Sequence, residues 1–421
     1  MINIKSVIVS RKALVLFDQG IFSGMSFLLN ILMAHLLTST DFGLFSSFIL
    51  LNYLLISVTN SLVINPLQIN LSGVEKKEEY VLFSFLFQLF LTIILLLTIQ
   101  LLFLLPFLNN FIHLKSPLLV FSFAFLFHDY FRKLFLAKED LKSTLYIDIL
   151  QLVSQISILA ILYRNNVHSL DSYLYGLSLG YFPGFLLAVS KIRFRNYTLV
   201  FFKLHVITHL QQGSWLLYTA FLQWTSGNFF TMVSGMYLGL EALGAFRLVQ
   251  SLFGLLNIVL QTFENYALPI ASRLQIISNK KSRAYINKIT LQASYLFIPV
   301  LLLLFIFSEK AITVFGGAKY LEYSYVVKLM ALLYLLIYFG YPLRMFIRLT
   351  KKNQFVFVGY FLSFLFSLCT FHFFLKHWSL TGAVIGLMTN QLLLMVYWKY
   401  ILTVKKSYHG NHTHCSGKSE P

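Results

Sequence analysis

The sequence contains few charged residues and only two cysteines. Asp, Glu, Lys and Arg make up 11% of its 421 residues, whereas 58% are hydrophobic. A water-soluble chain of this length carries far more charge, so the composition excludes an ordinary soluble enzyme. One cysteine, Cys369, lies in an apolar run, and the other, Cys415, lies in the polar C-terminal segment. They provide neither a disulfide framework nor a metal site, and we expect no metal and no cofactor.

Long apolar runs of Leu, Ile and Phe recur along the chain, and they exceed the roughly 18 residues that indicate a membrane-spanning helix. The runs are continuous rather than alternating, which favours helices over the strands of a membrane barrel. The short loops leave no room for a soluble catalytic domain. We therefore predict an all-α, polytopic integral membrane protein that is not an enzyme. Breaks at Pro, Gly and charged clusters predict twelve spans, at residues 13–37, 42–66, 80–106, 117–137, 145–163, 170–190, 213–237, 242–269, 289–308, 322–343, 355–375 and 380–404.

The formal net charge of +18 is distributed unevenly. When alternate loops are assigned to opposite sides of a membrane, nearly all Lys and Arg residues outside the spans fall on the side of the two termini. Cytoplasmic loops carry such an excess, so we expect both termini in the cytoplasm. The basic excess also attracts anionic lipid head groups. No interleaved basic and aromatic pattern indicates nucleic-acid binding, and we expect membrane lipid rather than nucleic acid as a partner.

Two segments of the chain resemble each other. Asp41–Phe45 and Ala242–Phe246 each close a turn, and the helix that follows each one ends at a proline, Pro66 or Pro269. Six spans separate the copies, so two halves would have the same orientation, as in alternating-access carriers. Chance recurrence in an apolar chain is the alternative. We predict two six-helix bundles at 1–190 and 213–404, a basic cytoplasmic linker at 191–212 and a polar cytoplasmic tail at 405–421.

The eighth predicted span carries six polar residues on one helical face. At 100° per residue, they fall within an arc of about 100°. Such a stripe either lines a hydrated path or forms interhelical hydrogen bonds, each worth about 0.6 to 2 kcal/mol, and the sequence leaves both readings open. The residues of this stripe are Arg247, Gln250, Asn257, Gln261, Glu264 and Asn265.

Two further spans carry shorter polar stripes. Together with the eighth span, we expect them to line a central cavity, with the second span (Asn52, Thr59, Asn60) as a weaker fourth member. The stripes are Gln19, Ser23, Ser26 and Asn30 on the first span, and Thr219, Gln223 and Ser226 on the seventh.

Charged residues inside spans are expensive and therefore informative. Arg247 has the planar fork that binds a phosphate or diphosphate bidentately, although it could also reach the interface from its helix end. Glu264 and Asp18 are candidate ion-coupling groups, with a helix-end or interfacial position as the alternative for each. Arg344 and Arg348 are either topology determinants or contacts for a lipid phosphate.

A second group of charged residues lies in the fourth and fifth spans. Asp129 has Arg132 and Lys133 three and four residues further on, which predicts a local ion pair on the surface. Asp148 lies near the start of the fifth span, so we expect it close to a helix end.

Trp224–Asn228 and Leu238–Arg247, with the polar stripe that follows, resemble the polysaccharide and O-antigen flippases. This family belongs to the multidrug/oligosaccharidyl-lipid/polysaccharide exporter superfamily. The stretch Asp18–Gly20 and the stretch Leu36–Gly43 are similar to the first hairpin of the family. His35 departs from the pattern, since such proteins commonly carry Arg there.

The resemblance implies a multi-pass protein of the bacterial cytoplasmic membrane that flips a polyprenyl-diphosphate-linked oligosaccharide for surface polysaccharide synthesis. Under this reading, the stripe residues bind the head group, Arg247 offsets the diphosphate charge, and two bundles rock to alternate access. We expect a monomer that works beside polysaccharide assembly proteins.

Three rival functions remain open. An ion-coupled drug exporter of the same fold would need an acidic cavity, and a flippase for the peptidoglycan precursor would carry more cavity arginines. A membrane polymerase, ligase or glycosyltransferase would need a larger outer loop with catalytic groups. No nucleotide-binding loop is present, so the sequence does not predict ATP-driven transport.

Overall fold

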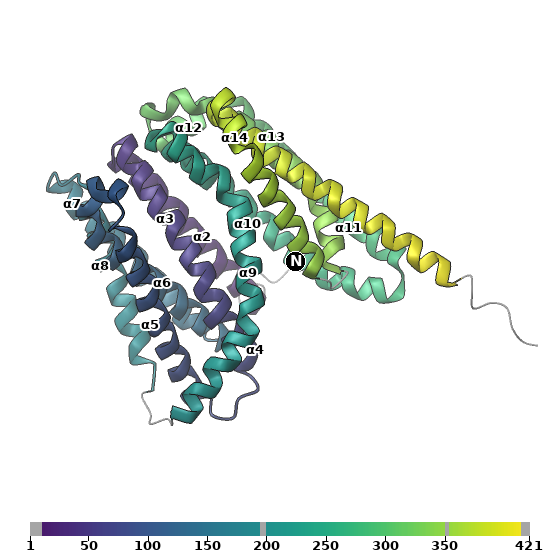
Figure 1. Cartoon of the computed structure of the whole chain (residues 1–421), viewed down its shortest axis with the longest axis horizontal. Helices are drawn as coiled ribbons and strands as arrows, with labels where there is room; N and C mark the ends of the chain where they lie inside the picture. The colour runs from purple at the N-terminus through teal and green to yellow at the C-terminus, as the bar shows by residue number, and fades with distance from the viewer. Residues whose placement is uncertain (1–10, 194–198, 350–352, 414–421) are drawn as a thin grey trace, which may run out of the picture. The chain divides into compact units, whose positions relative to one another are not determined.

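The computed structural model describes residues 11–193, 199–349 and 353–413, and helices account for nearly all of these residues (Figure 1). No strand is present in the described ranges. The elements of the first half are α2 (Arg11–Leu36), α3 (Ser39–Thr59), the π-helix η1 (Asn60–Ile64), α4 (Asn65–Asn70), α5 (Lys77–Leu102), the 3₁₀-helix η2 (Pro106–Leu114), α6 (Lys115–Ala137), α7 (Leu141–Arg164) and α8 (Leu170–Ser190). Those that follow are α9 (Leu199–Leu238), α10 (Leu240–Ile277), α11 (Asn279–Ile306), α12 (Ser308–Gly316), the 3₁₀-helix η3 (Ala318–Tyr323), α13 (Ser324–Leu349) and α14 (Asn353–Thr413).

The prediction of an all-α, polytopic membrane protein with twelve helical spans is confirmed. Within the described residues, nine helical segments are long and apolar enough to cross a membrane. The second span is formed by α3, η1 and α4 together. The last two spans form the two arms of α14, which meet at Ser379 with φ 50° and ψ −133°. The side of the membrane on which the termini lie stays a prediction.

The chain divides into two compact units, residues 1–224 and 225–421. Helix α9 contributes its first part to the N-terminal unit and its last part to the C-terminal unit. Part of the predicted linker, 194–198, lies outside the described residues, and from Leu199 onward the chain is helical. The predicted bundle and linker boundaries stay predictions.

Aromatic side chains form much of the core of the N-terminal unit. Helix α6 places Phe127, Phe131 and Phe135 one turn apart on the same face, and all three are buried. The ring of Phe185 on α8 lies with its centroid 5.8 Å from that of Phe127 and 5.6 Å from that of Phe131. Lipid tails are as apolar as these side chains, so close packing rather than escape from water holds such helices together.

Three glycines on α8 allow α7 to approach closely. Gly176, Gly180 and Gly184 are four residues apart and face α7. A Cβ atom on Gly180 would lie 2.3 Å from Cγ of Gln155, which no packed structure tolerates. Small residues at this spacing are typical of closely packed transmembrane helices. The glycine stripe therefore sets the distance between α7 and α8.

The C-terminal unit is built around α10, α11, α13 and α14. Phe253 on α10 packs against Tyr334 on α13, with the ring centroids 4.8 Å apart, and Phe297 on α11 stacks on Tyr338 of α13 at 4.7 Å. The Ser282 hydroxyl donates a hydrogen bond to the carbonyl oxygen of Ala271 and so ties the start of α11 to the end of α10. Helix α13 thus contacts both α10 and α11, and it positions the polar groups described next.

Candidate functional site

The polar stripe of the eighth predicted span lies on α10, and its first members form a hydrogen-bonded chain to α9. Nη1 of Arg247 donates to Oε1 of Gln250 over 3.0 Å. Nε2 of Gln250 in turn donates to the hydroxyl of Thr231 over 2.7 Å. Thr231 is buried, whereas Arg247 and Gln250 are half-buried. Gln250 on the same helix therefore orients the guanidinium of Arg247, and Thr231 on α9 holds Gln250 in place.

Further along α10, the stripe contacts α13. Nδ2 of Asn257 donates to the hydroxyl of Tyr334 over 2.8 Å, and Asn257 is an exposed residue. Gln261 is exposed as well, and the side chain of Asn265 lies outside the described residues. The stripe thus supplies hydrogen bonds between helices, and its part in binding a substrate stays a prediction.

Glu264 is buried and paired with three side chains of α13. The hydroxyl of Tyr341 donates to Oε2 of Glu264 over 2.8 Å. Nη1 of Arg348 lies 2.6 Å from Oε1, and Nε of Arg344 lies 3.8 Å from Oε2. The guanidinium of Arg344 also lies over the Tyr341 ring, 5.6 Å from its centroid. Two arginines, half-exposed, therefore meet a single buried carboxylate.

The other predicted stripes make mostly local contacts. On α2, Nδ2 of Asn30 donates to the carbonyl oxygen of Ser26, and Ser23 is half-buried, whereas the side chains of Asp18 and Gln19 lie outside the described residues. This bond lies within one helix, and the cavity role of α2 stays a prediction.

On α9, the three predicted residues differ. Thr219 bonds to the carbonyl oxygen of Trp215, and Gln223 is exposed. Ser226 is buried, and its hydroxyl donates to that of Ser363 on α14 over 2.8 Å. Ser226 therefore joins two helices of the C-terminal unit.

In the second span, Asn52 and Thr59 bond to carbonyl oxygens of their own helix. Asn60, the first residue of η1, instead accepts a hydrogen bond from Nζ of Lys133 on α6 over 2.8 Å. The weakest of the predicted stripes thus includes a residue that contacts a charged group.

The N-terminal unit contains a buried charge network on α6 and α7. Nζ of Lys133 lies 2.7 Å from Oδ2 of Asp129, so the predicted ion pair is confirmed. The prediction that it lies on the surface is wrong, because Asp129 is 7% exposed. Asp148 is in the second turn of α7 and is 0% exposed. Its Oδ2 atom lies 3.0 Å from Nε of Arg132, and its Oδ1 atom lies 3.2 Å from Nε2 of His128.

A signal for this network was present in the sequence. Two acids and two bases within two neighbouring apolar spans are too costly to leave unpaired in lipid. A local ion pair on the surface was the simpler interpretation of the sequence, because Asp129, Arg132 and Lys133 lie within about one turn of α6. The partner of Arg132 is 16 residues away on the next helix, and only the packing of α6 on α7 brings the two together.

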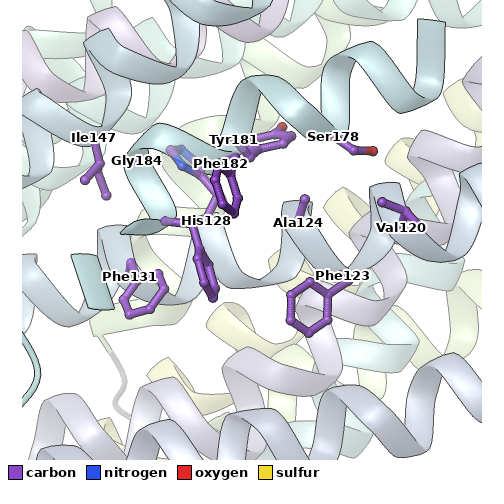
Figure 2. Close-up of a pocket in the computed structure, with 11 residues that line it drawn as sticks. Val120, Phe123, Ala124, His128, Phe131, Ile147, Ser178, Tyr181, Phe182 and Gly184 are labelled. Atoms are coloured by element: carbon purple, nitrogen blue, oxygen red, sulfur yellow. The ribbon is translucent and has the colours of Figure 1, made fainter. Parts of the chain in front are cut away.

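A small apolar cavity lies beside this network, between α6, α7 and α8. Its volume is about 180 Å³, and Figure 2 shows aromatic rings on several of its sides. The imidazole of His128 borders it, with its ring centroid 5.1 Å from that of Tyr181. The residues that line it are Val120, Phe123, Ala124, His128, Phe131, Ile147, Ser178, Tyr181, Phe182, Gly184 and Phe185.

The helices described so far are those of a multi-pass membrane protein. Residues 32–325 match the family described as polysaccharide biosynthesis protein, and the chain belongs to that family. None of the curated proteins matches the sequence.

Solved structures of the MOP superfamily have a similar fold. An inward-facing MATE multidrug resistance transporter superposes with a TM-score of 0.70 at 14% identity, over 92% of this chain and 95% of that one. An outward-facing MATE transporter gives 0.63 at 14% identity, over 94% and 96%. The lipid II flippase MurJ, in an inward closed conformation, gives 0.64 at 14% identity, over 93% and 87%. The chain therefore has the transporter fold of this superfamily.

Proposed function

We propose that the protein is a flippase that moves a polyprenyl-diphosphate-linked oligosaccharide across the bacterial cytoplasmic membrane by alternating access. Membership of the polysaccharide biosynthesis protein family, on a fold shared with a lipid II flippase, carries the proposal. Inward-facing and outward-facing neighbours of the same fold support alternating access. The predicted cytoplasmic termini and surface polysaccharide, including O-antigen or exopolysaccharide, as the product belong to this proposal.

The head group of such a substrate requires two kinds of contact. Its diphosphate needs cationic hydrogen-bond donors, and its sugars need amides and hydroxyls. Arg247, whose guanidinium Gln250 orients, is the candidate for the diphosphate. The candidates for the sugar hydroxyls are Gln250, Asn257, Gln261, Asn265, Gln19, Ser23, Ser26, Asn30, Gln223 and Ser226. Ion coupling through Asp18 or Glu264 is a separate part of the proposal.

Deletion and complementation in the native host test this function. We expect loss of the gene to abolish surface polysaccharide while complete lipid-linked repeat units accumulate on the inner leaflet. Single units that accumulate on the outer leaflet would instead indicate a missing polymerase or ligase step. Unchanged polysaccharide would refute the flippase.

The role of Arg247 is tested in the same strain. We expect Arg247→Ala to lower polysaccharide at least tenfold at equal protein level, because the diphosphate loses a bidentate partner. Arg164→Ala, an exposed arginine at the end of α7, is the matched control and should complement fully. Equal complementation by both variants would remove Arg247 from the substrate path.

An ion-coupled small-molecule exporter is the second candidate, since the MATE neighbours are multidrug transporters. Uptake of a labelled organic cation into inverted membrane vesicles separates the two functions. Transport of the cation that depends on an ion gradient, together with normal polysaccharide in the deletion strain, would establish the exporter.

A further inference from the structure

The cluster of Glu264, Arg344 and Arg348 has one more positive than negative charge. The side chain of Glu264 is 2% exposed, whereas those of Arg344 and Arg348 are 32% and 44% exposed. A buried carboxylate needs one cation to balance its charge. Arg348 supplies that cation at 2.6 Å, and Tyr341 satisfies the other carboxylate oxygen with its hydroxyl. The charge of Arg344, at 3.8 Å, therefore exceeds what Glu264 requires.

Among the described residues of the C-terminal unit, no second acid is paired with either arginine. Glu264 is the only acidic residue from Ala242 to Ser308, and the sequence has none from Tyr323 to Ser419. Glu241, at the start of α10, is more than six turns away, or roughly 35 Å along the helix. The loop after α10 and the first turns of α11 carry further bases instead, at Lys280, Lys281, Arg283 and Lys288.

The geometry of the two arginines suits an anion with several oxygens. Arg344 and Arg348 are four residues apart on α13, so their side chains leave the same face of the helix. Arg348 contacts Glu264 through Nη1. Within the described part of the chain, its Nε and Nη2 donors have no acceptor, so they can bind a further group. Arg344 is braced by the ring of Tyr341. Glu264 thus holds two guanidiniums in place while both remain accessible.

We propose that Arg344 and Arg348, positioned by Glu264 and Tyr341, form a phosphate site that receives the diphosphate of the lipid-linked substrate. Guanidinium forks bind phosphate oxygens bidentately. A diphosphate also carries more than the one negative charge that would balance this cluster. The inference rests on the proposed function. In the predicted orientation, this end of α13 faces the cytoplasm, from which the substrate would enter. The site is separate from Arg247, which lies nearer the other end of α10.

Direct binding to the full-length protein tests the site. The protein is reconstituted in phosphatidylcholine nanodiscs and titrated with radiolabelled polyprenyl diphosphate. We expect saturable binding to the wild type and at least tenfold weaker binding to the Arg344→Lys/Arg348→Lys double variant. This variant keeps both charges beside Glu264, and so the fold, but lacks the forks. Arg273→Lys, an exposed arginine on α10, is the matched control and should bind as the wild type does.

Competition distinguishes the possible sources of the phosphate. Inorganic pyrophosphate should displace the labelled lipid, because the site recognises the diphosphate. Displacement by phosphatidylglycerol but not by pyrophosphate would identify a site for bulk anionic lipid and overturn the proposal. Equal affinity of the double variant and the Arg273→Lys control would overturn it as well, as would absence of binding to the wild type.

Glu264→Gln tests the positioning role. The substitution raises the net positive charge of the cluster, so a purely electrostatic site would bind the diphosphate more tightly. We expect weaker binding by about tenfold, because the guanidiniums lose the acceptor that orients them. Tighter binding would overturn the assignment of Glu264 as a positioning residue.

The complementation assay separates this inference from the proposed function. If the wild-type gene restores polysaccharide and the double lysine variant does so equally well, the phosphate site fails while the flippase stands. If the wild-type gene is not needed for polysaccharide, the flippase fails, and the binding data then describe a diphosphate site with another purpose.

Discussion

The two units of the protein treat buried charge differently. In the N-terminal unit, two acids meet two bases, all four side chains are largely enclosed, and each acid contacts a base directly. In the C-terminal unit, one enclosed acid meets two half-exposed bases. A balanced, enclosed set is suited to holding helices in register, since a ligand would gain little from it. An unbalanced set at an accessible position is suited to binding an anion.

Breaking the balanced network should have the largest effect on stability. Asp148→Ala leaves Arg132 buried without its carboxylate, and we expect a loss of about 3 to 5 kcal/mol in the free energy of unfolding. Thermal unfolding of the purified protein in detergent measures it. Glu309→Ala, an exposed acid in the first turn of α12, is the control. An unchanged melting temperature for Asp148→Ala would mean that the network does not stabilise the N-terminal unit.

The glycine stripe of α8 provides a second test within the N-terminal unit. Gly180→Ala forces a Cβ atom onto Gln155, so α7 and α8 must separate, and we expect a loss of about 1 to 3 kcal/mol. Gly227→Ala on α9 meets no heavy atom within 4 Å and should leave stability unchanged or slightly higher. Similar melting temperatures for the two variants would argue against tight α7–α8 packing.

A smaller effect is expected at the start of α7. The side chain of Asp140 accepts a hydrogen bond from the backbone N–H of Ser143, and its loss in Asp140→Ala should cost about 1 kcal/mol. Partial burial raises the pKa of Asp140, but hydrogen bonds from Ser143 and the charge of Lys191 outweigh it and lower the pKa below its usual value. The contribution is therefore present at neutral pH and lost as the pH falls through the lowered pKa.

The difference between Asp140→Ala and the wild type should accordingly shrink in acid. Thermal unfolding of both proteins at pH 7 and at about pH 3 measures this change. A difference that stays constant over this range would show that the carboxylate charge contributes nothing at this helix start.

The smallest effect on stability is expected in the C-terminal unit. Asn257→Ala removes the hydrogen bond to Tyr334, and interhelical bonds of this kind contribute about 0.6 kcal/mol in membranes. Tyr334→Phe removes the same bond and leaves Asn257 in place. If Asn257 binds substrate, polysaccharide production should fall only in Asn257→Ala. An equal fall in both variants would assign Asn257 to helix packing alone.

The sequence predicted the helices better than the contacts between them. Each span needs a continuous apolar run, and that requirement is visible in any window of the chain. Which charges are enclosed depends on the neighbouring helix, so Asp148 and Arg132 could not be paired from spacing alone. The face of α10 was predictable from its period, whereas the contacts of Glu264 with Tyr341, Arg344 and Arg348 required knowledge of where α13 packs.

The π-helix η1 has a consequence for how the second span accommodates insertions and deletions. A wider turn contains an extra residue, so the side chains that follow it are rotated by about 100° relative to those of an uninterrupted α-helix. Asn60 opens this turn and reaches Lys133 from it, while Pro66 and Leu67 beyond it are buried. Removing a single residue between Asn60 and Ile64 would restore a regular helix and turn Pro66 and Leu67 away from the core. In this span, the irregular turn keeps the side chains before and after it directed toward the core of the N-terminal unit.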